Sequence, residues 1–432
     1  MRKKFVAFIL FVLFIFSSFL YAKSKAIVLN IDDCIINPVV YEYIHQGLKK
    51  ASLEEASIII IKLDTPGGLL ESTRKIVKEI LNSKIPVVVF VYPQGARAAS
   101  AGVFITISAH ISCMSPSTTI GAAHPVMMNN SWGNVDEELR KKIINDTLSW
   151  VESIAKKRSR NINWVKKAVE KSVSIDEEEA LKLKVIDLIA KDIPQLLEKL
   201  DGRRVKIDNL KYITLHTKDM QIIEFNMNLR QKILNALVNP QIAYILMLLG
   251  FFGLLYEVTH PGFGFPGIFG IVSLILSFYA FQILPVNYAG VALIVLGLVL
   301  LVVELLTPTF GIFTLGAGIC LVLGSLMLFN QKAPFLKISL ELIIGIVASL
   351  CLITLFLLTK VVIAQRGKPL TGKESLIGKV GVALTDINKK GKVEIEGSIW
   401  TALSQDYIKK DEEVIVERME GLKLWVKRKV GS

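Results

Sequence analysis

The apolar positions of this 432-residue chain fall into three successive patterns. From residue 25 to about 200, short apolar runs alternate with segments whose apolar residues recur at helical spacing. Long apolar blocks follow from residue 242, and residues 372–430 return to short strand patterns. Because continuous apolar runs are typical of strands buried on both faces, the first pattern predicts a parallel α/β sheet. The chain therefore divides into an α/β domain, an α-helical multispan membrane domain and a small all-β domain.

The first domain is predicted to be built from strand–helix–strand units. Its segments are a strand at Ala26–Asn30, a helix through Val39–Leu48, strands at Ile58–Ile61 and Val87–Val91 with a helix between them, apolar segments at Ile105–Ile107 and Ile111–Met114, and a long amphipathic helix at Glu137–Lys157. Basic residues close that last helix, as suits a helix C-terminus. Residues 203–238 are polar and mixed, and we interpret them as a connector that closes the domain.

Five apolar blocks make up the membrane domain. They cover residues 242–257, 267–284, 289–306, 310–329 and 339–360. Each is near the ~20 residues that a helix needs to cross the hydrocarbon layer. The first block is short, so four spans with a re-entrant segment is the alternative to five. With the first domain outside and five spans, the C-terminus lies inside, and Lys360 and Arg366 agree with the positive-inside rule.

One motif occurs twice among these blocks. The pattern Glu-x-x-x-Pro-x-Phe-Gly starts at Glu257 and again at Glu304. Its repetition predicts a duplicated helical hairpin. Acids inside membrane segments are candidates for function. Because both glutamates stand at predicted helix ends beside prolines, we expect them to cap helices rather than to line a transport pathway.

The last domain contains five short strands separated by turns. They are Gly378–Ala383, Gly391–Ile395, Trp400–Leu403, Glu413–Glu417 and Leu422–Val426. Five such strands favour a small closed barrel of the OB-fold type. Trp400 and Trp425 are candidates for stacking on bases, but the acids that surround them dilute any basic surface. We therefore expect a protein-interaction module and no nucleic-acid partner.

Composition supports the membrane interpretation. The apolar fraction is 52% and the mean hydropathy is +0.50. The net charge of +13 is spread over the non-membrane parts and the membrane flanks, without the basic stripe interleaved with aromatics that nucleic-acid binding requires. The four cysteines lack metal-ligand spacing, so we expect neither a metal nor another cofactor.

The N-terminus has the pattern of an export signal. Met1-Arg2-Lys3-Lys4 is followed by an apolar stretch and then by small residues, which predicts a signal peptide over residues 1–22. Leu20 at the −3 position is imperfect for cleavage after Ala22, so an uncleaved anchor is the alternative. In both cases the first domain is expected outside the cytoplasm.

Two loops carry the candidate chemistry. Asp64-Thr-Pro-Gly-Gly68 follows the first central strand, and Gly95–Gly102, with Ser100 inside it, follows the second. Because consecutive parallel strands end at one edge of the sheet, we expect both loops on the same side. Each loop alone is ordinary turn or packing sequence. Together they offer backbone donors beside a hydroxyl, which are the two halves of an acyl-transfer site, and they indicate a serine hydrolase.

The residues alone do not fix the base for this serine. His110, His124, Lys141 and Lys142 are candidates in the same domain. A lysine acts as a base only where burial or neighbouring charges lower its pKa from about 10.4 toward neutrality. Both lysines also fit the ordinary role of solvated helix charges. Arg97, where a small residue is ordinary, points to a preference for an anionic or C-terminal group.

Several motifs together resemble the long form of the NfeD family, membrane proteins with a Clp-type (crotonase-like) serine protease domain. The motifs are the two loops, Ile120-Gly-Ala-Ala-His-Pro125, the Glu179-Ala-Leu pattern ending at Asp187, the multispan region, and Gly378-Lys-x-Gly381 with Thr385-Asp386. The resemblance covers nearly the whole chain. It implies a signal peptide at 1–22, a protease domain at 23–235, a transmembrane domain at 240–362 and an OB-fold at 370–432.

The resemblance also assigns roles to residues. The family's Ser–Lys dyad matches Ser100 as nucleophile and Lys142 as base, the latter counted back from an Arg-Asn pair at residues 160–161. Gly67 and Gly68 match the backbone donors of the oxyanion hole, with the N–H of Ala101 as a further donor.

His124 is the alternative base. Soluble Clp proteases place a histidine about two dozen residues after the serine, and His124 fits that offset. Ser172 occupies the position of their aspartate, which weakens this histidine because the acid fixes the tautomer and stabilises the imidazolium.

The expected function is that of a multi-pass, membrane-bound serine endopeptidase with an exported catalytic domain. The resemblance implies that its substrates are apolar segments of stomatin- or prohibitin-like membrane proteins, that it forms a dimer or higher homo-oligomer, and that the OB-fold is cytoplasmic. The alternative is a non-catalytic membrane scaffold for stomatin-like partners. A transporter built on the repeated hairpins lacks a convincing polar pathway.

Overall fold

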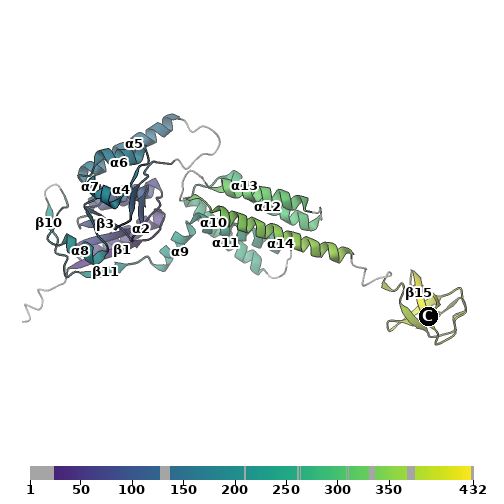
Figure 1. Ribbon diagram of the computed structural model, residues 1–432. Helices are drawn as coiled ribbons and strands as arrows, with labels where there is room; N and C mark the ends of the chain where they lie inside the picture. Colours follow the sequence, from purple (N-terminus) through teal and green to yellow (C-terminus); the bar gives the residue numbers. More distant parts are fainter. Residues whose placement is uncertain are drawn as a thin grey trace, which may run out of the picture. The chain divides into compact units, whose positions relative to one another are not determined.

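The computed structural model describes residues 24–126, 137–208, 211–259, 262, 264–307, 309, 311–329, 336–366 and 375–429 (Figure 1). The predicted signal peptide lies outside these residues. Six parallel strands form the main sheet of the first domain, in the order β11-β1-β2-β3-β5-β8. They are β1 (Lys25–Ile31), β2 (Ile58–Leu63), β3 (Val87–Val91), β5 (Ile111–Met114), β8 (Leu188–Ile189) and β11 (Gln221–Phe225).

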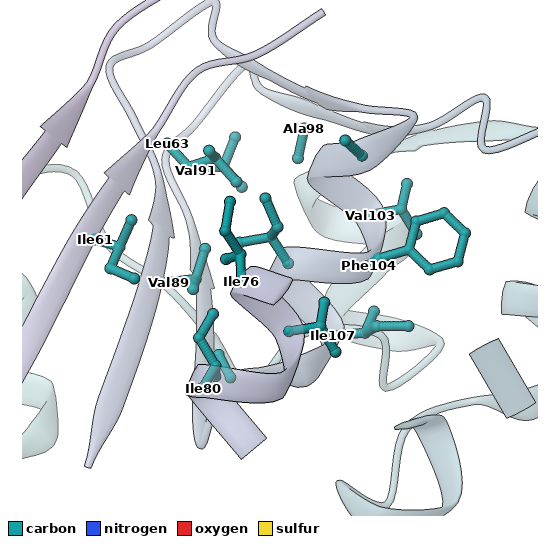
Figure 2. Close-up of a cluster of buried hydrophobic side chains, with 14 of the residues drawn as sticks. Ile61, Leu63, Ile76, Ile80, Val89, Val91, Ala98, Val103, Phe104 and Ile107 are labelled. Carbon is teal, nitrogen blue, oxygen red and sulfur yellow. The ribbon is translucent and has the colours of Figure 1, made fainter. Parts of the chain in front are cut away.

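Both faces of this sheet are covered, so alternate residues of each strand enter separate cores. Ile59 and Ile61 pack on the helical side, where Figure 2 shows Ile76 and Ile80 facing the strands. The helices on this side are α2 (Pro38–Leu53), α3 (Leu70–Asn82), α4 (Ala101–Ser108), α5 (Glu137–Lys157) and α6 (Ile162–Glu170). The opposite core contains α8 (Ile193–Leu200) and the hairpin of β9 (Arg204–Lys206) and β10 (Tyr212–Thr214).

A second, three-stranded sheet lies beside the carboxyl edge of the first. It consists of β4 (Arg97–Ala99), β6 (Thr119–Gly121) and β7 (Ser174–Asp176), and the short helix α7 (Glu177–Lys182) follows it. The apolar segment Ile105–Ile107 lies in helix α4. All eight residues of this helix are buried, so its sequence is apolar on every side and shows no helical period.

Residues 203–238 close the first domain as predicted, but as regular structure rather than as a connector. This segment supplies β9, β10 and the edge strand β11, which pairs in parallel with β1, and it ends in helix α9 (Leu229–Leu237). The strand was missed because an edge strand is partly solvated, so its sequence lacks a continuous apolar run.

Among the described residues of the membrane part, four helices are long and apolar enough to cross a bilayer, and a fifth is shorter. They are α10 (Pro240–Thr259), α11 (Phe265–Ile283), α12 (Tyr288–Leu306), α13 (Ile312–Leu328) and α14 (Leu340–Arg366). The first block was predicted to be the short one, and this is wrong. Helix α10 starts early, with Pro240 in its first turn, and spans 20 residues, whereas α13 has 17.

The repeated glutamates join the helices of each hairpin, as predicted. Glu257 accepts hydrogen bonds from the backbone N–H groups of Gly264 (3.1 Å) and Gly267 (3.4 Å) at the start of α11. Glu304 accepts from the N–H groups of Thr309 (3.1 Å) and Gly311 (3.0 Å), just before α13. A carboxylate at the end of one helix thus binds N–H groups that the next helix leaves unpaired, which makes capping its structural role.

The last part of the described chain is a closed five-stranded barrel in the order β12-β13-β14-β16-β15. Its strands are β12 (Val380–Ala383), β13 (Lys390–Ile395), β14 (Ser398–Leu403), β15 (Glu413–Glu420) and β16 (Lys423–Arg428). All five predicted strands are present. The three predicted architectures are therefore confirmed: an α/β domain, an α-helical part with spans long enough for a membrane, and a small closed all-β barrel.

Candidate functional site

The two predicted loops lie side by side. Thr65 donates its N–H to the carbonyl of Arg97 at 2.8 Å, and its own carbonyl accepts from Ala99 at 3.1 Å. A Cβ placed on Gly102 would lie 2.9 Å from Cγ2 of Thr65, so the first turn of α4 packs directly on this loop. The glycine loop after β2 and the serine loop before α4 thus form one structural unit, as the strand order predicts.

Ser100 occupies a sharp turn between β4 and α4. Its φ of +51° and ψ of −107° are unusual for a residue with a side chain, and such a conformation costs about 1–3 kcal/mol. The turn is held by a hydrogen bond from Ser100 N–H to the carbonyl of Gly121 at 3.0 Å. Within the described chain, Oγ of Ser100 makes no hydrogen bond, and the residue is half-buried. A serine on a strained strand-to-helix turn is the arrangement that presents a nucleophile in many hydrolases.

Backbone donors lie next to this serine. The N–H groups of Gly68 and Ala101 have no acceptor among the described residues, whereas Gly67 N–H donates to Oγ1 of Thr65 at 3.1 Å. Position 68 requires glycine, because a Cβ there would lie 2.2 Å from the carbonyl oxygen of Ile36. Of the three predicted donors, Gly68 and Ala101 therefore have N–H groups without an acceptor in the described part of the chain.

Helix α5 runs in the same direction as α3. Arg74, near the start of α3, forms an ion pair with Asp146. Arg158, just past the end of α5, donates from Nη2 to the carbonyl of Ile80 near the end of α3, at 3.4 Å. The two contacts, one in the middle of α5 and one at its C-terminal end, follow the same order along both helices, so the N-terminal end of α5 lies toward the Gly68 end of α3.

Contacts with α4 give the same direction. The rings of Phe104 and Trp150 stack with centroids 4.7 Å apart, and Nε of Arg158 donates to the carbonyl of Ser108 at 2.8 Å. At 1.5 Å per residue, the N-terminal turns of α5 extend past Phe104 toward the end of α4 that carries Ser100.

Lys142 lies in the N-terminal part of α5, at this end of the domain, but off the buried stripe formed by Thr147, Val151, Ile154 and Ala155. It precedes Asp146 by one turn and Trp150 by two, so these three residues share one helix face. Lys141 points along a different face. Lys142 makes no contact with Ser100 in this structure. The Lys142 side chain is 69% exposed, and its Nζ lies 2.9 Å from Oε1 of Glu138.

The two candidate histidines differ sharply. His124 follows Gly121 by three residues, and its Nδ1 lies 2.8 Å from the carbonyl oxygen of Val169, so a backbone carbonyl orients the ring. His110 is buried just before β5, at the opposite end of α4 from Ser100, and burial together with nearby Arg158 lowers its pKa to about 3. Its position excludes His110 as a base for Ser100.

Sequence analysis missed the acids that surround Arg97. The carboxylate of Asp64 accepts the Arg97 N–H at 2.9 Å, and burial raises the pKa of Asp64. The Arg97 guanidinium lies 3.6 Å from Asp33. The position of Asp64 at the start of the glycine loop was the sequence signal that could have identified it. Asp33 has no such signal, because it reaches Arg97 only in the folded chain. Among the described residues, no group of three or more His, Cys, Asp or Glu side chains forms a metal site.

Three family models match the chain in succession. They are the NfeD1b N-terminal domain over residues 26–221, the NfeD integral membrane domain over 241–360, and the NfeD-like C-terminal, partner-binding domain over 373–428. With four helices long enough to cross a bilayer, the membrane-domain match makes the chain a multi-pass membrane protein.

Similar proteins cover most of this chain. The membrane-bound protease PH1510 of Pyrococcus horikoshii is 34% identical over 96% of both chains, and the membrane protein NfeD1b of Bacillus subtilis is 28% identical over 89% of both. A solved structure, the 1510-N membrane protease specific for a stomatin homolog from Pyrococcus horikoshii, is 33% identical and covers 50% of this chain and 98% of its own, with a TM-score of 0.43. On the extent and identity of these matches, the chain belongs to the NfeD family, in its long form with all three domains.

Proposed function

We propose that this protein is a membrane-bound serine endopeptidase with Ser100 as its nucleophile and Lys142 as its base. The observation that carries the proposal is the strained turn at Ser100, with the free N–H groups of Gly68 and Ala101 beside it. The position of Lys142 at the same end of the domain supports the choice of base. The name of the Pyrococcus horikoshii relative, a membrane-bound protease, supports the reaction class.

The chemistry follows from these groups. Neutral Lys142 removes the proton from Ser100 as Oγ attacks the scissile carbonyl. The N–H groups of Gly68 and Ala101 donate to the oxyanion that forms. The lysine then gives the proton to the leaving amine, and water, activated by the same lysine, hydrolyses the acyl-enzyme.

Lys142 has to leave Glu138 before it acts. An exposed ion pair between residues i and i+4 contributes only about 0.3–0.5 kcal/mol, so exchanging Glu138 for Ser100 costs little. Substrate that covers the site also excludes water from around the amine of Lys142.

The test uses the full-length protein in detergent, a fluorophosphonate probe and a peptide from an apolar membrane segment. We expect Ser100→Ala to abolish labelling and cleavage, and Lys142→Ala to abolish cleavage. Lys141→Ala, a matched exposed lysine paired with Glu137, leaves both intact. Retained cleavage in Lys142→Ala together with its loss in His124→Ala would assign the base to His124 instead.

A non-catalytic scaffold is the second candidate. The observation that favours it is the absence of a hydrogen bond between Ser100 and Lys142, both described residues. The C-terminal family model, described as partner-binding, fits this role as well. Failure of Ser100 to react with the probe at any pH between 6 and 10, while the protein still binds its partner, would favour the scaffold over the enzyme.

We further propose that the substrate is a stomatin-like membrane protein and that the enzyme acts as a dimer or higher homo-oligomer. The solved Pyrococcus horikoshii relative is named for a stomatin homolog. Cleavage of a stomatin-like protein in co-reconstituted vesicles, compared with an unrelated single-span protein, tests the substrate class. Mass photometry of the detergent-solubilised protein tests the oligomer.

The proposed topology places the protease domain outside and the barrel in the cytoplasm. This requires α13 to cross the bilayer: its 17 residues give about 25 Å of helix, somewhat less than the ~30 Å hydrocarbon layer. The exposed positions in Lys182→Cys and Lys410→Cys report on the two domains separately. Labelling of only the first from outside intact cells supports five spans, and labelling of both requires four.

A further inference from the structure

A cavity of about 190 Å³ lies at the opposite end of α4 from Ser100. Its walls come from the end of α5, the start of β5 and strand β9. Five of its lining residues are cations, and two are acids, Asp187 and Asp208. The cations are Lys157, Arg158, Arg203, Arg204 and Lys206. Nothing in the proposed peptidase chemistry uses this cavity.

Arg158 is the innermost of these cations by its contacts. Its Nε donates to the carbonyl of Ser108 at 2.8 Å, and Nη2 lies 3.4 Å from the carbonyl of Ile80. No carboxylate within the described ranges forms an ion pair with it. Burial, with a smaller effect from nearby Arg160, lowers the pKa of Arg158 to about 10. A partly buried guanidinium held only by carbonyls keeps an unbalanced positive charge.

His110 adds neither charge nor an acceptor for this arginine. Its Nδ1 accepts the N–H of Val87 at 3.2 Å, and with its pKa lowered to about 3 the ring is neutral at physiological pH. The other ring nitrogen, Nε2, therefore carries the hydrogen. Nη2 of Arg158, 3.3 Å away, finds no acceptor there.

One of the two acids at the cavity, Asp187, is already engaged. Asp187 accepts from the backbone N–H of Ser112 at 2.7 Å and from Arg160 at 2.6 Å, and it lies 3.6 Å from Arg203. Arg204 stacks over the ring of Tyr212 at 4.7 Å. Apart from Arg203, none of the lining cations has an ion pair with an acid in the described part of the chain.

We propose that this cavity binds a phosphate-class oxyanion. Guanidinium groups match the oxygens of phosphate in geometry as well as in charge, and several cations around one small space favour a dianion over a single carboxylate. Drug-sized ligands occupy roughly 300–1,000 Å³, so this smaller cavity fits a phosphate with at most a small substituent and no nucleotide. The proposal does not depend on peptidase activity.

Two sources offer this chemistry: free inorganic phosphate and the phosphomonoester headgroup of an anionic lipid. The full-length protein in a neutral detergent and phosphate-free buffer distinguishes them. Isothermal titration with inorganic phosphate measures the first source, and titration with dihexanoyl phosphatidic acid below its micelle concentration measures the second. Binding of either ligand supports the cavity, and the tighter one identifies the source.

The variants are chosen from exposed cations that hold no backbone carbonyl. We expect Arg204→Ala and Lys206→Ala each to weaken binding about tenfold, and Lys206→Glu to abolish it. Lys171→Ala, an exposed lysine outside the cavity, leaves binding unchanged. The unfolding temperature of each variant, measured without ligand, shows that the domain is intact. Binding of neither ligand to the parent protein, or equal binding by Lys206→Glu and the parent, overturns the proposal.

Discussion

Substituting Gly68 by alanine tests whether the glycine loop positions a catalytic donor. A Cβ at position 68 would lie 2.2 Å from the carbonyl oxygen and 2.5 Å from the nitrogen of Ile36. Both atoms are backbone, so no side chain can rotate away. To restore an ordinary contact of more than about 3.4 Å, the loop has to move by roughly 1 Å.

The size of the effect follows from this displacement. Two hydrogen bonds hold the loop to Ile36, from Ile36 N–H to Gly67 at 2.9 Å and from Leu69 N–H to Ile36 at 2.8 Å. Losing both costs about 1–3 kcal/mol of stability, which the large core tolerates. A misplacement of about 1 Å in an oxyanion donor lowers the rate by about 100-fold. Gly68→Ala is therefore expected to reduce kcat far more than stability.

The assay compares kcat for peptide cleavage with the unfolding temperature of the full-length protein. Gly202→Ala is the control: it has a φ of +72° and open space around it, so alanine there introduces backbone strain away from the site. We expect the control to lower the unfolding temperature without lowering kcat. If Gly68→Ala keeps the kcat of the parent, the glycine loop does not bind the oxyanion and the proposed site is wrong.

Three further predictions concern separate features. Glu138→Gln releases Lys142 from an exposed ion pair of about 0.5 kcal/mol, so kcat/KM for peptide cleavage should rise about twofold; a fall would mean that Glu138 positions the base. The pKa of His110 is about 3 in the folded protein and 6.5 in the unfolded chain, so the unfolded chain binds the proton more tightly. The contribution of neutral His110 to folding stability is therefore complete above pH 6.5. It is lost at about 1.4 kcal/mol per pH unit as the pH falls toward 3. In His110→Gln the measured slope of stability against pH should lose this one-proton component, and an unchanged slope would refute the assignment. Glu304→Gln weakens the cap before α13, so amide exchange at Thr309 should accelerate, and unchanged exchange would show that the charge is dispensable.

Sequence patterns predict the elements whose residues share one environment. The strands β2 and β3 are apolar throughout because both of their faces are covered, and helix α5 has the predicted bounds, Glu137–Lys157, because its buried residues recur at helical spacing. Patterns fail where the sequence has no clear period. Strand β11 alternates irregularly at a solvated edge, and α4 is apolar on all sides, so neither has a period that identifies it.

The candidate site was predictable to a similar extent. The order of consecutive parallel strands brings the two loops to one edge, which places Ser100 near Gly68 without any knowledge of side chains. Which backbone N–H groups lack an acceptor depends on contacts that the strand order does not reveal. Thr65 takes up the N–H of Gly67, and Ile36 excludes a side chain at position 68, and both contacts join segments that are distant in sequence.

Helix direction decides what Lys142 can do. Periodicity places Lys142 and Trp150 on one face of α5, but a face alone is compatible with either direction along α4. If α5 ran opposite to α4, Lys142 would lie at the end that holds His110, far from the serine. The contact of Arg158 with Ser108, combined with the stacking of Trp150 on Phe104, fixes the parallel direction. Arg158 therefore aligns the helix that carries the proposed base while it lines the proposed anion cavity, so substitutions at Arg158 affect both sites, and only the outer cavity cations separate them.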